Sequence, residues 1–251
     1  MTAIPTRSNP RTYLSISDIE KIFTRFPEGT SSYIPLMVGY HCGMRLSETF
    51  ALTWENIDFE HRTIRIERQI QWHQNDRSKE EKEKHNGKSQ PGAGYWYFSS
   101  PKYDSVRTID MDEALAVALE REYARQLRAE EYFGERYIRY YENANHVIVK
   151  TPNENRIMFV CVRENGEYYN SRNMQYTSQI IHRQLNIPGF DYHSLRHTHA
   201  TMLLDAGAPL KYIQYRLGHK NIDITLNVYQ HFTESSRIQG NERLNGMFLD
   251  T

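Results

Sequence analysis

Four short segments of the chain place cationic or nucleophilic side chains beside a helix end or a tight turn. They are residues 43–48 (GMRLSE), 101–107 (PKYDSVR), 193–197 (HSLRH) and 217–219 (LGH), the last followed by Tyr229 in the sequence VYQH. Together they supply arginines, a lysine, histidines and a phenol. These residue types suit an attack on a phosphodiester, because arginine offers a planar fork of donors that matches phosphate oxygens.

The reaction itself explains why each type is needed. When an oxygen nucleophile attacks a phosphodiester, negative charge gathers on the non-bridging oxygens, and preorganised donors there lower the barrier. A tyrosine hydroxyl, with an ordinary pKa of about 10, must lose its proton and needs a base or strongly positive surroundings. The departing 5′ oxygen needs a proton, which a lysine can supply if neighbouring arginines lower its pKa.

In order and spacing, the four segments resemble the motif set of the tyrosine recombinase (phage-integrase) family. The resemblance covers the chain from Tyr13 to Phe232, most of its 251 residues. It implies an α+β catalytic domain, mostly helical with a small antiparallel β-sheet at one edge. It also implies a site-specific DNA recombinase that cleaves and rejoins strands through a 3′-phosphotyrosine, with no cofactor and no metal.

The resemblance implies a phosphate-binding role for several of these residues. Arg45 and Arg196 match the two arginines that clamp the scissile phosphate, and His219 would donate a hydrogen bond to it. Glu48 matches the acidic residue three positions after the first arginine, whose role is supportive. Because lysine would act only as a point charge, Arg45→Lys should be costly.

The remaining matches concern the nucleophile and its protons. Tyr229 resembles the family's nucleophile, and His193 is the candidate base that takes its proton. Lys102 resembles the lysine of a β-hairpin turn and is the candidate acid for the departing 5′ oxygen. The expected partner is double-stranded DNA, with a homo-tetramer on DNA and a monomer without it.

Each residue alone has an ordinary structural explanation, and other functions stay open. The chain has 18 tyrosines, and Tyr229 is distinguished only by its register with the LGH segment. His193 and His197 also have metal-ligand spacing, but Ser194 stands where a zinc peptidase of the H-E-x-x-H type needs glutamate. His197 and His199 are interpreted as packing or hydrogen-bonded residues. Two functional alternatives are a type IB topoisomerase-like enzyme and a DNA-binding protein that has lost catalysis.

These segments must be brought together by helices and strands, which hydrophobic periodicity predicts. Ser17 and Asp18 are the expected N-cap of a first helix that stops at Pro27 and Gly29. The further predicted helices cover residues 32–40, a segment from Ser47, 111–142 with an interruption at Gly134, 173–185, 194–205, 210–217 and 222–232. The predicted strands cover residues 63–70, 95–99, 106–109 and 156–162.

Charge and composition limit the class of protein. Lys and Arg number 31 and Asp and Glu number 31, so the net charge of zero predicts modest affinity for DNA unless charge is unevenly distributed. Residues 171–220 are indeed rich in bases and 112–142 in acids.

Two cysteines, Cys42 and Cys161, are interpreted as free thiols of a reducing compartment. No signal core or membrane span is recognisable, so a cytoplasmic location is expected.

The expected organisation is a single catalytic domain with two appendages. Residues 1–12 are interpreted as a linker or tail, 13–232 as the catalytic domain and 73–94 as a mobile polar insertion between strands. Residues 233–251 are a C-terminal tail that either folds back or is exchanged between protomers. Integrases of this type usually carry a DNA-binding domain ahead of the catalytic part, so either a shortened chain or another source of DNA grip is expected.

Overall fold

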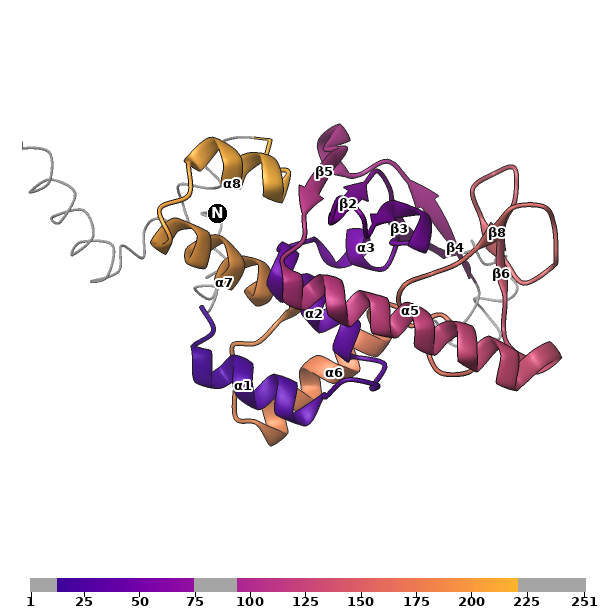
Figure 1. The fold of residues 1–251 in the computed structure, drawn as a ribbon, viewed down its shortest axis with the longest axis horizontal. Helices are drawn as coiled ribbons and strands as arrows, with labels where there is room; N and C mark the ends of the chain where they lie inside the picture. The colour runs from indigo at the N-terminus through magenta and orange to yellow at the C-terminus, as the bar shows by residue number, and fades with distance from the viewer. Residues whose placement is uncertain (1–12, 75–93, 221–251) are drawn as a thin grey trace, which may run out of the picture.

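The computed structural model describes residues 13–74 and 94–220, and the findings below concern these ranges. Figure 1 shows them as an α+β fold, which confirms the expected class. The α-helices are α1 (Ile16–Arg25), α2 (Tyr33–Cys42), α3 (Leu46–Thr49), α5 (Glu113–Phe133), α6 (Ser171–Gln184), α7 (Tyr192–Asp205) and α8 (Leu210–Leu217). Single 3-10 turns are η1 (Trp54–Asn56), η2 (Lys102–Asp104) and η3 (Gly134–Arg136).

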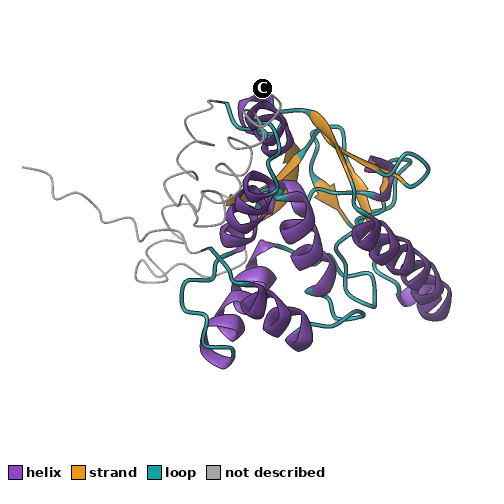
Figure 2. Ribbon diagram, turned by 60° about the vertical axis from the view of Figure 1, so that its left-hand side comes forward, coloured by secondary structure: helices purple, strands orange, loops and turns teal. Residues whose placement is uncertain are grey.

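The strands are short and entirely antiparallel, and in Figure 2 they gather on one side of the helices. They are β1 (Ile57–Asp58), β2 (Thr63–Ile66), β3 (Gln69–Gln74), β4 (Gly94–Ser99), β5 (Arg107–Asp110), β6 (Tyr140–Glu142), β7 (Ile148–Val149) and β8 (Arg156–Ile157). They form three small sheets, ordered β1-β2-β5, β3-β4 and β7-β6-β8, where the sequence predicted one sheet.

Helix α2 is the centre of the fold (Figure 1) and packs against α5 and α7. It is apolar on all sides, and Leu36, Val38 and Cys42 are fully buried, as expected for a helix covered by other elements. At Gly39 a Cβ would lie 2.8 Å from Leu195 Cδ1, so only glycine permits the close approach of α7. This contact fixes α7, which carries the third of the four segments.

The predicted strand at 63–70 is wrong in one respect, because it is two strands with different partners. β2 pairs with β5, whereas β3 pairs with β4, and the chain changes partner at Glu67 and Arg68. Arg68 turns outward to an ion pair with Glu142 at 2.7 Å. The turn η2, which joins β4 to β5 and carries Lys102, therefore connects two separate sheets.

Two predicted boundaries also change. Helix α1 begins after Ser15, not after Ser17 or Asp18, because Ser15 Oγ accepts from Asp18 N at 3.1 Å and Asp18 Oδ2 accepts from Ser15 N at 3.2 Å. The predicted helix over 111–142 ends at Phe133, where Gly134 adopts φ 53°. Its predicted last residues form β6 instead.

The other predictions are confirmed, are confirmed in part, or concern residues outside the described ranges. The predicted helix 210–217 coincides with α8, and 173–185 and 194–205 match α6 and α7 within two residues. Only Arg156–Ile157 of the predicted strand 156–162 is a strand. Both cysteines are buried free thiols, and burial raises the pKa of Cys42 to about 12. The helix expected at 222–232, nearly all of the 73–94 insertion and both tails lie outside the described residues.

Candidate active site

The site is built where the C-terminal ends of α2 and α8 meet. Each helix ends in a glycine in the left-handed region, Gly43 with φ 63° and Gly218 with φ 65°. A Cβ on Gly43 would lie 2.7 Å from Leu217 Cδ2, and one on Gly218 would lie 2.8 Å from Arg107 Nη1. Glycine at both positions thus lets the two helix ends approach, and brings the residues that follow them, Arg45 and His219, into one region.

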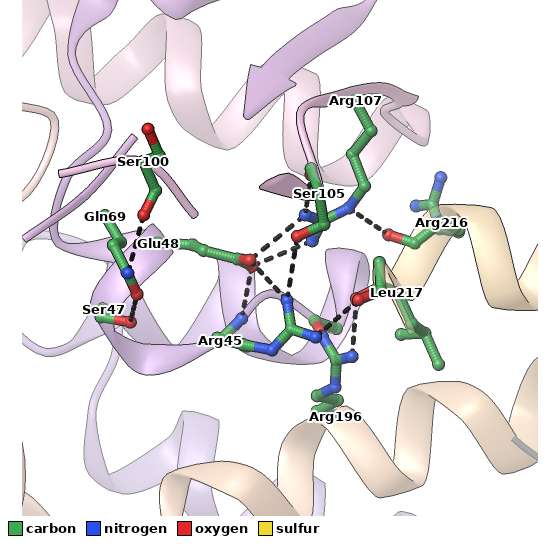
Figure 3. A network of polar contacts seen from close by, with 12 residues as sticks. Arg45, Ser47, Glu48, Gln69, Ser100, Ser105, Arg107, Arg196, Arg216 and Leu217 are labelled. Carbon is green, nitrogen blue, oxygen red and sulfur yellow. Dashed lines mark hydrogen bonds and ion pairs between the residues drawn. The ribbon is translucent and has the colours of Figure 1, made fainter. Parts of the chain in front are cut away.

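Three arginines from different elements satisfy the end of α8 (Figure 3). The last carbonyls of a helix have no partner inside it and carry its partial negative charge, so cations stabilise them. The carbonyl oxygens of Arg216, Leu217 and Gly218 accept, in that order, from Arg107 Nε at 2.8 Å, Arg196 Nη2 at 2.6 Å and Arg45 Nη2 at 2.6 Å. Arg45 and Arg196 therefore meet at adjacent peptide groups, although 151 positions separate them in the sequence.

Glu48 holds the side chain and the backbone of Arg45 in place. Its side chain is fully buried and accepts from Arg45 Nη1 at 2.7 Å and from the backbone N–H of Arg45 at 3.0 Å. The same carboxylate accepts from Arg107 Nη1 at 3.2 Å and Nη2 at 2.9 Å (Figure 3). Burial alone would raise the pKa of Glu48, but the hydrogen bonds and charges of Arg107 and Arg45 outweigh it and lower that pKa. Glu48 is therefore a carboxylate that holds two guanidiniums.

Arg196 is the most deeply buried of the expected site residues that carry a positive charge. It lies in α7, whose first turn is capped by Asp191, and only 3% of it is exposed. Besides Leu217, its guanidinium reaches the carbonyl of Gly43, with Nη1 at 2.8 Å. Arg196 thus links the ends of α2 and α8, and its orientation is fixed by the two helices that form the site.

His219 directly follows Gly218 at the end of α8, and the charges of Arg196 and Arg45 act on it. Its backbone N–H donates to the carbonyl of Gln214 at 3.1 Å. Burial, and then the positive charges of Arg196 and Arg45, lower the pKa of His219 to about 3. The imidazole is therefore neutral at physiological pH, with one N–H to donate and one nitrogen that can accept.

His193 and His197 lie one turn apart in α7. Their ring centroids are 5.1 Å apart with the planes close to perpendicular, and both residues are half-buried. Both act electrostatically on His219, which places them beside the arginine cluster. Within residues 13–74 and 94–220, no group of three or more His, Cys, Asp or Glu side chains could hold a metal ion.

Lys102 lies at the rim of the site. It belongs to the exposed turn η2, in which Tyr103 and Asp104 both adopt positive φ, 63° and 47°. The turn meets the arginines through Ser105, whose Oγ accepts from Arg45 Nη1 at 3.4 Å. At the same turn the ring of Tyr103 lies 5.6 Å from Lys220 Nζ, next to His219. Tyr229, the expected nucleophile, lies outside the described residues.

An open cleft of about 340 Å³ runs between η2 and the end of α8. Its walls include Tyr103, Ser105, Arg107, Gln214, His219 and Lys220. Of the expected site residues, His219 lines this cleft, and Arg45 contacts its wall at Ser105 and Gly218. Lys102 lies on the turn η2, whose next residue, Tyr103, is part of the wall. An anion bound between the arginines would meet several donors and one neutral imidazole.

Two arginines of the network were not predicted as site residues. Arg107 is the first residue of β5 and faces inward with Ile109, so its place in an alternating strand could have indicated a buried partner. Arg216 donates from Nε to His199 Nε2 at 3.0 Å and from Nη2 to the carbonyl of His41 at 3.0 Å. His199 also donates from Nδ1 to the carbonyl of Tyr40 at 2.9 Å, so its expected hydrogen-bonding role is confirmed.

Comparison with known proteins gives one family. The phage integrase family model matches residues 12–91 and 92–236. A tyrosine recombinase XerC-like protein of Caldanaerobacter subterraneus subsp. tengcongensis is 28% identical over 214 residues, 85% of this chain and 49% of that protein. The transposase from transposon Tn916 of Enterococcus faecalis is 28% identical over 241 residues, 94% of this chain and 52% of that protein. The chain spans about half the length of these curated relatives.

Solved structures give the same result. The integrase of transposon Tn1549, in complex with transposon right end DNA, superposes with a TM-score of 0.66 at 25% identity, covering 96% of this chain and 69% of that one. The XerA recombinase superposes with a TM-score of 0.59 at 18% identity, covering 96% of this chain and 66% of that one, which shows the shared fold. None of the helices in the described ranges is long and apolar enough to cross a membrane.

Proposed function

The chain belongs to the phage integrase family, and from this premise we propose that it is a site-specific DNA recombinase that cuts and rejoins DNA through a 3′-phosphotyrosine at Tyr229. The observation that carries the proposal is the meeting of Arg45 and Arg196 at the adjacent carbonyls of Gly218 and Leu217. Two guanidiniums fixed side by side form a preorganised receptor for a phosphodiester.

Arg45 keeps one edge of its guanidinium for the phosphate. The hydrogen bonds described for it use Nη1, toward Glu48 and Ser105, and one hydrogen of Nη2, toward Gly218. The edge formed by Nε and the second Nη2 hydrogen matches two phosphate oxygens. Neutral His219 donates a further hydrogen bond to the same phosphate, which spreads the charge that develops in the transition state over several donors.

Two side chains handle the protons in the proposed reaction. His193, half-buried beside the cluster, accepts the proton of the Tyr229 hydroxyl as it attacks the phosphorus. Lys102, on the exposed turn η2, gives a proton to the departing 5′ oxygen. The 5′ hydroxyl of a partner strand then attacks the phosphotyrosine, releases Tyr229 and joins the new ends, so the number of phosphodiester bonds is unchanged.

The proposed partner is double-stranded DNA, because a solved relative is described in complex with transposon end DNA. We assign residues 13–232 to the catalytic domain, with 1–12 a linker or tail, 73–94 a polar insertion between strands and 233–251 a C-terminal tail that either folds back or is exchanged between protomers. The active assembly is a homo-tetramer on two DNA sites, formed from monomers in the cytoplasm of a bacterium.

The test is covalent capture. Wild-type protein is incubated with a library of nicked random duplexes. Cleavage near the nick releases a short fragment with a free 5′ hydroxyl, and its loss traps the covalent adduct. The DNA ends attached to the protein are then sequenced. Tyr229→Phe should bind the recovered site with unchanged affinity and form no adduct. An undiminished adduct with Tyr229→Phe would show that another tyrosine attacks. A wild-type protein that forms adducts without sequence preference and relaxes any supercoiled plasmid would be a topoisomerase instead.

A further inference from the structure

Arg107 has an unusual place for a strand residue. It begins β5 with its side chain pointing inward, and it is 4% exposed. All its described hydrogen bonds go to the site: two to Glu48, one to the carbonyl of Arg216 and one to the carbonyl of Ser105. A charged side chain is costly to bury unless its partners compensate it, so these contacts decide whether Arg107 can occupy this position.

The contacts with Glu48 divide one carboxylate between two arginines. Arg107 takes both carboxylate oxygens, with Nη1 at 3.2 Å from Oε1 and Nη2 at 2.9 Å from Oε2. The Arg45 side chain contacts only Oε1, through Nη1 at 2.7 Å. If Arg107 were absent, Arg45 could turn both of its terminal nitrogens onto Glu48, and the single negative charge of Glu48 would neutralise its only cationic partner.

The contact with α8 adds a second constraint. Arg107 Nε donates to the carbonyl of Arg216 at 2.8 Å, next to the carbonyls that hold Arg196 and Arg45. The face of Gly218 lies against the guanidinium of Arg107, because a Cβ there would meet Nη1 at 2.8 Å. Arg107 therefore contacts both the carboxylate that anchors Arg45 and the helix end that carries His219.

We propose that Arg107 is a positioning residue of the active site, which occupies Glu48 bidentately and so keeps the edge and charge of Arg45 available for the scissile phosphate. The proposal rests on the recombinase function proposed above. With two guanidiniums on one carboxylate, the cluster of Arg45, Glu48 and Arg107 keeps a net positive charge. Arg107 itself touches no DNA and acts through Glu48.

The test compares Arg107→Lys with a matched variant, Arg125→Lys. Arg125 also makes a two-point contact with a glutamate, Glu122, with Nε and Nη2 at 2.7 and 2.6 Å, but it lies in α5 and none of its described contacts reaches the site. Both variants keep the charge and lose the fork. We measure thermal unfolding, affinity for the DNA site recovered by capture, and the single-turnover rate of adduct formation at saturating DNA.

Arg107→Lys should bind DNA within about twofold of wild type and cleave about 10- to 100-fold more slowly, while Arg125→Lys cleaves like wild type. In a Glu48→Gln background, Arg107→Lys should cause little further loss, because the carboxylate it positions is gone. Equal rates for Arg107→Lys and wild type would overturn the proposal. So would a full, additive loss in the Glu48→Gln background, which would show that Arg107 acts independently of Glu48.

If Arg107→Lys does not fold, the double variant Arg107→Met with Glu48→Gln removes both buried charges and is compared with Glu48→Gln alone. Equal rates for these two proteins support the proposal, and a rate at least tenfold lower in the double variant contradicts it. Wild-type protein serves as the reference throughout. If it formed no adduct on any DNA, the recombinase function would fail, whereas an active wild type with an unaffected Arg107→Lys would refute only the role of Arg107.

Discussion

Nη2 of Arg45 donates to the carbonyl oxygen of Gly218 at 2.6 Å, so the first arginine of the site is bonded to the peptide group directly before His219. The contact joins the end of α8 to residues that follow α2, far apart in the sequence. A movement of the guanidinium would move His219, and a movement of the helix end would turn the guanidinium. Residues after His219, which lead to Tyr229, begin from this fixed point.

Arg45→Lys should therefore slow cleavage about 100- to 1,000-fold, the range found when one preorganised transition-state donor is removed. A lysine ammonium is a point charge, which cannot serve Glu48, Gly218 and a phosphate at the same time. The rate of covalent adduct formation on the captured DNA site measures the loss. Arg65→Lys is the matched control, because Arg65 is 64% exposed and pairs only with Glu67 among its described contacts, and its rate should equal that of wild type.

Gly218→Ala should destabilise the protein by about 1–2 kcal/mol more than Gly29→Ala. Both glycines have positive φ, 65° and 90°, so both variants carry the strain of a side chain at positive φ. At Gly29 nothing lies within 4 Å of an added Cβ, whereas at Gly218 it would meet Arg107, which several hydrogen bonds hold in place. Chemical denaturation of the two variants measures the difference.

The same pair of variants separates packing from strain in catalysis. Gly218→Ala should also slow adduct formation, because Arg107 must move to admit the methyl group, while Gly29→Ala should not. Equal destabilisation of the two variants would show that the close approach of Arg107 to Gly218 contributes nothing beyond backbone strain.

Lys102→Ala should slow cleavage of ordinary DNA and be rescued when sulfur replaces the 5′ bridging oxygen of the scissile phosphate. A thiolate leaves without an acid, so a missing proton donor no longer matters. The ratio of adduct rates on the two substrates is the measurement. If Lys102→Ala is slow on both substrates, Lys102 is not the proton donor. Its role in the turn η2 is then structural or one of DNA binding.

The sequence predicted best those elements whose limits are marked locally. Helix α8 was located correctly because Pro209 precedes it and Gly218, in the left-handed region, ends it. The strand at 63–70 was not divided, because its alternation continues while the change of partner from β5 to β4 is a tertiary event. Local patterns cannot reveal such an exchange of neighbours.

The site shows the same limit. Family resemblance selected Arg45, Glu48, Arg196 and His219, and the structure brings them together, but it assigned no role to Arg107, the partner that completes Glu48. Arg107 is 59 residues from Glu48, and a charged residue on the inward face of a strand is the only local sign of their contact. The low pKa of His219 was also beyond reach, because burial and the approach of Arg196 and Arg45 exist only in the folded chain.

His199 predicts how stability depends on pH. Burial, and then the charge of Arg216, lower its pKa to about 3, while the unfolded chain has the ordinary value of about 6.5. Between these values the unfolded state binds the proton more readily, so the free energy of unfolding decreases as the pH falls through this window. His199 is only 8% exposed and stays neutral in the folded chain at pH 5. The free energy of unfolding at pH 5 is therefore about 2 kcal/mol lower than at pH 8 from this residue alone.

His199→Gln removes the titration and should make the loss of stability between pH 8 and pH 5 smaller by about 2 kcal/mol. Glutamine can still accept from Arg216, but the carbonyl of Tyr40 loses its donor, so the variant should be about 1–3 kcal/mol less stable than wild type at pH 8. His219 titrates in both proteins and cancels in the comparison. Urea denaturation at several pH values decides it. Parallel stability curves for the two proteins would mean that the pKa of His199 is not lowered in the folded chain.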